Sequence, residues 1–361
     1  PRLRKPGGVR GRVAGAWGFH LINRFGWRKN LVCRQGEIAK RMAVNRDKPD
    51  RWKEDIAKSV DMYNDWFMSF APEAYRTTRV RTTRDVEASL KATKNLTDVG
   101  VELLKSSPMV LPSLRMSTCP PLAVDRLIAL ADVSRNLVRT MEKDNGLPPR
   151  MSRPELYRDL KKIGNTIEKM ADPDIFTWLE RGDDPSEQEL YRAATIVADR
   201  LCGAVANPII RNAQEKRQLS AIGEWLTNLG YQNPPVGKVN KWNEMQPGTF
   251  SFRLNVPVKQ EGTGNTINIP VDAAVMPKTA IAGELPLLIE AKSAGDYTNV
   301  NKRRKEEAAK MSQLRRTYGQ DVRFILFLCG YFDSGYLGYE AAEGIDWVWE
   351  HRIDDLKEFG L

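Results

Sequence analysis

The chain is poor in the residues that several common enzyme chemistries require. It has two histidines in 361 residues, His20 and His351, and they are too few and too far apart for a histidine-based metal nuclease or phosphodiesterase. Its four cysteines stand singly, so no Cys-x-x-Cys pair suggests a zinc site or a disulfide framework. The pattern Gly-x-x-x-x-Gly-Lys-Ser/Thr is missing too, which argues against ATP-driven translocation by this chain.

Long hydrophobic runs are also scarce. No continuous apolar run approaches the roughly 18 residues that would span a bilayer, and the N-terminal residues lack the apolar core of a secretory signal. With 41% hydrophobic residues, the chain still has enough apolar side chains to build the cores of two ordinary domains. We therefore expect a protein without membrane spans that is located in the cytoplasm.

The formal net charge of +10 comes from one segment. Residues 1–41 hold 11 Lys or Arg and a single acidic residue, Glu37, while the rest of the chain has 45 basic and 45 acidic residues. Two interpretations of this basic extension stay open. It is either an arm that tethers nucleic acid or a disordered, non-native stretch upstream of a start at Met42. The overall charge is therefore weak support for nucleic-acid binding.

The pattern of apolar residues divides the remainder into a helical part and a mixed part. Apolar side chains at three-and-four spacing predict an all-helical domain over residues 42–206. A long helix from Ile209 to Leu229 would then open a second domain over residues 207–361. The predicted helices of the first part are Trp52 to Phe70, Val86 to Leu96, Pro121 to Val133, Asn136 to Asp144, Pro154 to Met170 and Ser186 to Val205.

Strand-like segments follow in the second part. Alternation and β-branching predict strands over Thr249 to Val256, Thr266 to Val275 and Leu285 to Ala291, then a basic helix from Asn299 to Tyr318, then strands over Val322 to Cys329 and Ile345 to Trp349. The expected fold class is α/β, with a mixed sheet flanked by helices after a large helical domain.

Three polar residues on two of these strands form the candidate site. Side chains of a strand alternate between faces, so Glu290 and Lys292 point the same way. If the preceding strand is a neighbour, Asp272 joins them. Two carboxylates and an ammonium group at one point are typical of metal-assisted phosphodiester hydrolysis, because Mg²⁺ prefers hard oxygen ligands and a cation assists at the attacked phosphate.

Two similar tripeptides test how specific this pattern is. Asp159 precedes Lys161, and Asp355 precedes Lys357, by the same spacing. Both lie in helical sequence, where positions two apart diverge around the helix axis. The non-catalytic interpretation of Glu290 and Lys292 is a salt bridge on an edge strand. The order of elements around them favours catalysis.

The arrangement resembles the PD-(D/E)XK nuclease superfamily from Ile209 to about His351. The shared features are a helix, three strands, a helix and a strand, with Asp on the second strand and Glu-x-Lys on the third. One departure is Pro270, which stands two residues before Asp272 instead of immediately before it. The resemblance implies a Mg²⁺-dependent nuclease.

A narrower resemblance covers most of the chain from Met42 onward. The segments Arg51 to Tyr75 and Asn207 to Tyr231, together with the Glu290 motif, are similar to the XamI family of type II restriction endonucleases. This resemblance implies double-strand cleavage of a short palindromic DNA site, such as GTCGAC. It also implies a homodimer that acts on double-stranded DNA, and functional pairing with a cognate DNA methyltransferase.

Further site residues follow from the resemblance and from position. Related nucleases bring a glutamate from the helix before the sheet to the metal, which here would be Glu215. The bland interpretation is a solvated helix charge. The Ala291 backbone carbonyl would be a further ligand. The basic helix after the site would contact DNA phosphates, and asparagines in the loop from Val236 to Gln246 are candidates for reading bases. The phosphate-binding candidates are Lys302, Arg303, Arg304 and Lys305.

Two other functions use the same residues. A structure-specific repair or recombination nuclease would have the same metal site, with the helical part recognising a junction. A DNA-binding protein with an inactive nuclease fold is the non-enzymatic alternative.

Overall fold

The computed structural model describes residues 43–361, apart from 236, 237, 240, 261, 263, 282 and 299, and it describes only the backbone of residues 301–303. The basic extension over residues 1–41 and the start considered at Met42 lie outside the described residues.

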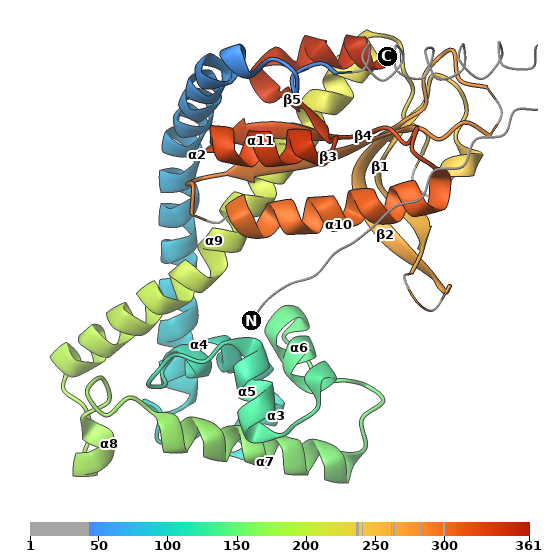
Figure 1. Cartoon of the computed structure of the whole chain (residues 1–361). Coiled ribbons are helices and arrows are strands. Elements are labelled where there is room, and N and C mark those ends of the chain that lie inside the picture. Colours follow the sequence, from blue (N-terminus) through green and yellow to red (C-terminus); the bar gives the residue numbers. More distant parts are fainter. Residues whose placement is uncertain are drawn as a thin grey trace, which may run out of the picture.

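The protein is mixed α/β, with a helical region followed by a five-stranded mixed sheet and flanking helices (Figure 1). The elements of the helical region are α2 (Pro49–Ala92), α3 (Val101–Ser106), η1 (Pro108–Val110), α4 (Leu111–Met116), α5 (Val124–Ala131), α6 (Arg135–Asp144), α7 (Arg153–Met170), α8 (Trp178–Arg181) and α9 (Glu187–Asn228). The sheet region contains η2 (Trp242–Glu244), β1 (Phe250–Lys259), β2 (Thr266–Val275), β3 (Leu287–Ala294), α10 (Val300–Tyr318), β4 (Phe324–Gly330), α11 (Ser334–Ala342), β5 (Asp346–Trp349) and η3 (Glu350–Phe359).

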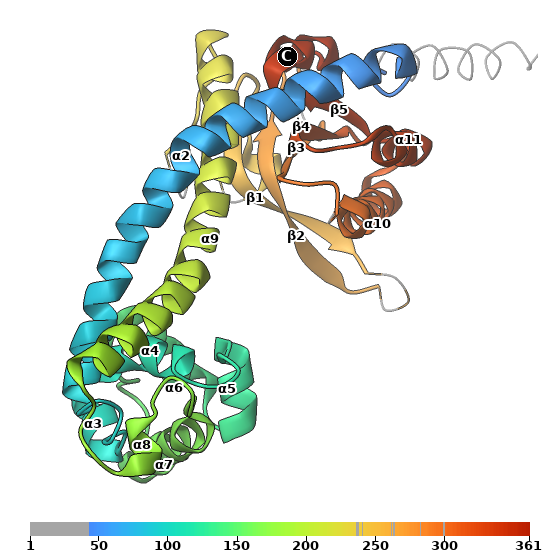
Figure 2. The same cartoon turned by 90° about the vertical axis from the view of Figure 1, so that its left-hand side faces the viewer.

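Two long helices connect the sheet with the helical region. α2 has 44 residues and α9 has 42, and they run side by side between the two ends of the molecule (Figures 1 and 2). The predicted division of each into two separate helices was wrong. α2 continues through Pro72 and α9 through Pro208, because a proline removes one helical hydrogen bond, a loss that packing between two long helices can offset.

The helical region has its own apolar core. Leu104, Leu114, Met141, Ile163 and Trp178 are buried in it with side chains of α2 and α9. Side-chain caps fix the starts of two of these helices: Ser152 accepts a hydrogen bond from the Glu155 amide at the start of α7, and Ser186 forms a capping box with Glu189 at the start of α9. These caps satisfy amides that the first helical turn leaves without partners. The helices between Val101 and Met116, α8 and α11 were not predicted. The proposed division at residues 206 and 207 stays a prediction, and α9 crosses it without a break.

The sheet has the strand order β1-β2-β3-β4-β5. β1, β2 and β3 are antiparallel neighbours, whereas β3, β4 and β5 are parallel. α10 and α11 cover one face, where Met311, Leu314 and Leu337 are buried. α9 and η3 cover the other face, where Ile222 and Leu356 are buried. All five predicted strands are confirmed: both ends of β2 and the last residue of β5 agree, and the other ends are shifted by one to three residues.

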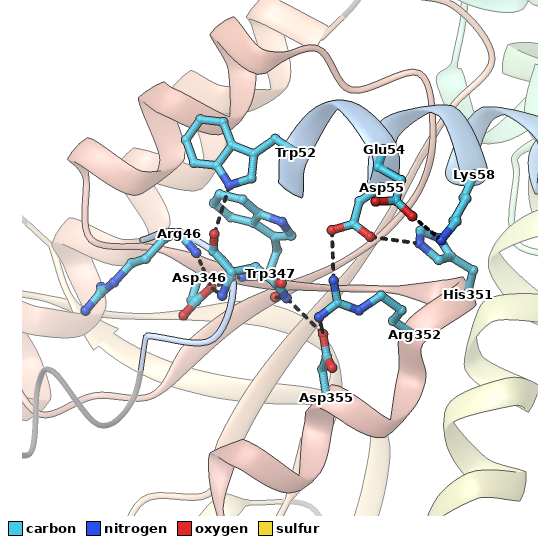
Figure 3. Close-up of polar contacts among 11 residues, drawn as sticks. Arg46, Trp52, Glu54, Asp55, Lys58, Asp346, Trp347, His351, Arg352 and Asp355 are labelled. Carbon is cyan, nitrogen blue, oxygen red and sulfur yellow. Dashed lines mark hydrogen bonds and ion pairs between the residues drawn. The ribbon is translucent and has the colours of Figure 1, made fainter. Parts of the chain in front are cut away.

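The beginning of α2 is fixed to the outer edge of the sheet. The Asp346 carboxylate of β5 accepts hydrogen bonds from the backbone amides of Val44, Asn45 and Arg46 (Figure 3). The indole of Trp52 packs edge-on against Trp347 with ring centroids 5.4 Å apart. One turn later, the Asp55 carboxylate lies 2.8 Å from the Arg352 guanidinium of η3 and 3.4 Å from His351. The sheet and the helical region are therefore joined by a helix that is held at both ends.

One described helix, α9, is long and apolar enough to pass a test for a membrane span, with a window of mean hydropathy 1.3. The window is an average that includes polar residues, so it does not contradict the lack of a long continuous apolar run. A helix in the core of a protein that does not enter a membrane can pass the same test. Here α9 packs against α2 and β3.

Candidate active site

Arg253, Asp272 and Glu290 lie in one row across three neighbouring strands. In the register of β1 with β2, Phe252 faces Ala273 and Leu254 faces Val271, so Arg253 stands opposite Asp272. β2 and β3 pair only from Ala273 with Ile289 onward. The next position in that register would bring Asp272 opposite Glu290, which is the point where β2 leaves β3.

Both strands of the β1–β2 hairpin change faces at this row. In a regular strand, residues two apart share a face. Here the side chains on either side of Arg253 and of Asp272 enter opposite cores. On the α9 side lie Phe250, Phe252, Ala273 and Val275, and on the α10 side lie Leu254, Val256, Val258, Ile269 and Val271. In β1 the change coincides with a left-handed backbone at Arg253, where φ is +54°. The hairpin is therefore bent at the residue that carries the first carboxylate.

The Asp272 side chain substitutes for the sheet hydrogen bond that is lost at the divergence. Its Oδ2 accepts a hydrogen bond of 2.8 Å from the backbone amide of Ala291, which fixes the carboxylate beside Glu290 and Lys292. Burial raises the pKa of Asp272 to about 6, and the negative charge of Glu290 adds to this, while the Ala291 amide and Lys292 oppose it. The free Asp272 carboxyl group is therefore harder to ionise than an exposed aspartate.

Glu290 lies between two lysines. Its Oε1 is 3.0 Å from the Lys292 ammonium, and its Oε2 is 2.8 Å from the ammonium of Lys310 on α10. Lys310 also donates to the backbone carbonyl of Pro270 at 2.9 Å. Burial alone would lower the pKa of Lys292, but the charges of Glu290 and Glu307 outweigh it and raise the pKa above its usual value. Lys292 is therefore held in its charged form.

A second pair of carboxyl groups lies behind Lys292. Glu307 of α10 is 3.6 Å from the Lys292 ammonium and accepts a hydrogen bond of 2.8 Å from the Tyr336 hydroxyl. Burial raises the pKa of Glu307, whereas Lys292 and Tyr336 lower it. In the neighbouring Glu340, burial and the charge of Glu307 raise the pKa to about 9. Glu340 is thus protonated at neutral pH, and the Glu307 carboxyl group is the one that faces Lys292.

Glu215 of α9 reaches the edge of the site but is held by another residue. Its Oε1 is 2.9 Å from the guanidinium of Arg253, and its charge contributes to the raised pKa of Asp272. One turn along α9, the amide of Gln218 donates to the backbone carbonyls of Lys292 and Phe327, each at 3.3 Å. α9 is therefore tied to the strand that carries Glu290 and Lys292.

Comparison with known proteins decides the family. The XamI restriction endonuclease family matches residues 94–349 of this chain. The chain belongs to the XamI restriction endonuclease family. It is 53% identical over 317 residues to the type II restriction enzyme SalI of Streptomyces albus G, a match that covers 88% of this chain and 99% of SalI. The protein is accordingly a site-specific deoxyribonuclease.

Two weaker similarities complete the comparison. The type II restriction enzyme XamI of Xanthomonas campestris pv. amaranthicola is 27% identical over 130 residues, which cover 36% of this chain and 42% of XamI. Among solved structures, protein VC1899 from Vibrio cholerae matches at a TM-score of 0.26 and 14% identity, over 80% of this chain and 56% of that protein. A TM-score this low carries no argument about fold.

The structure separates this restriction endonuclease's candidate site from the two similar tripeptides. Asp159 and Lys161 lie in α7, and Asp355 and Lys357 lie in η3, as expected. Asp159 is bound to the Ser134 amide and to Arg158. Of the three tripeptides, the one with Glu290 and Lys292 lies on a strand, and the Asp272 carboxylate of the neighbouring strand lies beside it.

The basic residues predicted to bind DNA differ in their surroundings. The side chains of Lys302 and Arg303 lie outside the described part. The Arg304 guanidinium stacks on the Tyr339 ring of α11, 3.9 Å from its centroid, whereas Lys305 is exposed. Phosphate binding by these residues stays a prediction. In the loop predicted to read bases, positions 236, 237 and 240 are likewise outside the described residues, and Asn243 is exposed.

Sequence reasoning missed Arg253, Glu307 and Lys310 as neighbours of the site. For Glu307 and Lys310 a signal exists, because residues three apart share a helix face, but it was hidden in a run of basic residues. For Arg253 no signal exists in the sequence, because its place opposite Asp272 depends on the register of the hairpin.

Proposed function

We propose that this restriction endonuclease is a Mg²⁺-dependent enzyme of the PD-(D/E)XK type that cuts both strands of a short palindromic site, GTCGAC or a similar sequence. The single observation that carries the proposal is the convergence of Asp272, Glu290 and Lys292 where β2 leaves β3. A structure-specific repair nuclease would share these residues, but its family would differ.

The donor set fits a hard divalent cation. Asp272 and Glu290 offer carboxylate oxygens, which Mg²⁺ prefers, and burial, together with the charge of Glu290, raises the pKa of Asp272, so a bound cation would favour its ionised form. Glu215 and the Ala291 carbonyl would be further ligands. Among the described residues, no three carboxyl, imidazole or thiol groups are close enough together to form a complete site. Glu215 would have to leave Arg253 to join.

Each side chain then has a defined task. Asp272 and Glu290 would hold a Mg²⁺ ion, which would supply Lewis-acid stabilisation of the phosphate and a lowered pKa for a water nucleophile. Lys292 donates hydrogen bonds to a phosphate oxygen or to the attacking water, and its raised pKa keeps it charged for this. Glu307 holds Lys292 from behind. The Ala291 amide fixes Asp272. No covalent intermediate is needed.

The remaining expectations rest on the family. Double-strand cleavage of a palindrome implies a two-fold symmetric homodimer with one site for each strand. A cognate DNA methyltransferase would protect the host's own sites, and the enzyme would act in the cytoplasm, where that DNA lies. The basic residues Lys302, Arg303, Arg304 and Lys305 would contact phosphates.

Plasmid digestion tests the proposal. The full chain with Mg²⁺ should give discrete fragments, and EDTA should abolish them. Lys292→Ala should lose cleavage while its affinity for site-containing duplex in Ca²⁺ changes by less than about threefold. Cutting restricted to junctions would indicate a repair nuclease, and no cutting by the wild-type chain would indicate a binding protein. Wild-type cleavage by Lys292→Ala would refute the assigned site.

A further inference from the structure

The backbone of Arg253 is strained, and no contact of Arg253 described in the free protein offsets that strain. Arg253 has φ of +54° in the middle of β1, a conformation that glycine adopts without cost and other residues do not. Its ion pair with Glu215 is exposed, with 71% of the Arg253 side chain and 40% of the Glu215 side chain accessible. Such pairs return little stability, so the ion pair does not compensate the strain.

The position of Arg253 suggests which ligand could offset the backbone strain. The residue stands opposite Asp272, in the row that continues to Glu290. A cavity of about 670 Å³ between α9 and β1 adjoins it, and this cavity is lined by Lys216, Ser220 and Arg253 among other residues. Lys216 and Arg253 thus face this open space, together with the Glu224 carboxylate. Arginine binds phosphate through two parallel hydrogen bonds. An exposed guanidinium can therefore give up a carboxylate partner and bind a phosphate instead.

We propose that Arg253 binds a backbone phosphate of the cleaved DNA strand, and that this exchange releases Glu215 to complete the divalent-cation site with Asp272 and Glu290. The inference rests on the proposed function, because it concerns the same metal site. It explains why the free protein brings together two carboxylates and holds the third away. A complete metal site would then form only with DNA in place.

Two binding measurements on the full-length chain test the exchange. Arg253→Gly removes the guanidinium and keeps the left-handed backbone free of strain, so it should fold. Without DNA, its affinity for Mn²⁺, measured by calorimetry, should rise by about three- to tenfold over wild type, because Glu215 is released. In the double variant with Glu215→Gln, this gain should vanish.

The second measurement concerns DNA. In Ca²⁺, which supports binding without cleavage, Arg253→Gly should bind site-containing duplex about tenfold more weakly. The slope of log affinity against log salt should fall by about one, as expected for the loss of one phosphate contact. Lys357→Ala is the matched control, since Lys357 is an exposed cation of the sheet region that pairs with Asp354 at 2.6 Å. It should change neither affinity.

The outcomes separate this inference from the proposed function. If Asp272→Asn loses no Mn²⁺ affinity, the metal site itself is wrong. If Asp272→Asn weakens Mn²⁺ binding while Arg253→Gly leaves it unchanged, the exchange is refuted and the metal site stands. An unchanged salt slope in Arg253→Gly refutes the phosphate contact.

Discussion

Arg253 of β1 lies directly opposite Asp272 of β2, and at this pair both strands exchange the faces that they present to the two cores. A regular hairpin would continue beside β3 and leave Asp272 in an ordinary ladder. The bend instead separates β2 from β3. The Ala291 amide then donates its hydrogen bond to the Asp272 carboxylate and not to the backbone of β2. Bends of this kind re-aim side chains next to active sites. The candidate active site is thus a product of an irregularity in the sheet.

Glu307 is expected to act as a positioning residue for Lys292. Its charge contributes to the raised pKa of Lys292, so Glu307→Gln should lower that pKa and loosen the ammonium group. We expect cleavage to fall by about tenfold. The alkaline limb of the pH–rate profile should move to lower pH, because Lys292 then loses its proton more readily. Glu306→Gln is the control, since Glu306 is exposed one residue away. An unshifted alkaline limb in Glu307→Gln would show that its charge does not act on Lys292.

Glu340 should make the stability of the fold depend on pH. Its pKa is about 9 in the folded protein against an ordinary value of 4.5, so between these values the folded state binds a proton that the unfolded state has lost. The free energy of unfolding therefore decreases as pH rises through this window, by at most about 1.4 kcal/mol per pH unit from this group. Glu340→Gln should flatten that decrease in urea unfolding between pH 6 and pH 8.5.

A neighbouring charge provides the comparison for Glu340. Glu343 is exposed one turn later, so Glu343→Gln should retain the wild-type slope. Equal slopes for Glu340→Gln and wild type would mean that the buried carboxyl group is already ionised at neutral pH.

Gly330 is required where β4 ends beside β3. Its φ is +101°, and a Cβ atom there would lie 2.1 Å from the Ala294 carbonyl oxygen, whose backbone cannot yield easily because Tyr331 donates to the same carbonyl. Gly330→Ala should lower the free energy of unfolding by about 3 kcal/mol, from strain and overlap together. Gly319 also has positive φ, at +94°, but nothing lies within 4 Å of its Cβ position.

Gly319→Ala therefore isolates the cost of the backbone conformation, which should be about 1 kcal/mol. Chemical denaturation of both variants measures the difference. Similar losses in the two would show that the overlap at Gly330 is relieved by movement of the strand end.

The sequence was most informative where local chemistry decides structure. Ser186 starts its helix as predicted, because its side-chain oxygen satisfies an amide within its own turn. β-branched and apolar alternation found every strand. The same local reasoning failed at Pro72 and Pro208, where packing between α2 and α9 outweighs the breaking tendency of proline.

By itself, the sequence determined the order of the five strands along the chain and the family resemblance, and it predicted the three residues Asp272, Glu290 and Lys292, because strand alternation and residue chemistry are local properties. Only the tertiary structure decided which charges surround them. Lys310 and Glu307 arrive from α10, Glu215 from α9 and Arg253 from β1. These contacts depend on strand register and on which helix covers each face, and both are set by burial of distant side chains. The opening between β2 and β3 has the same origin.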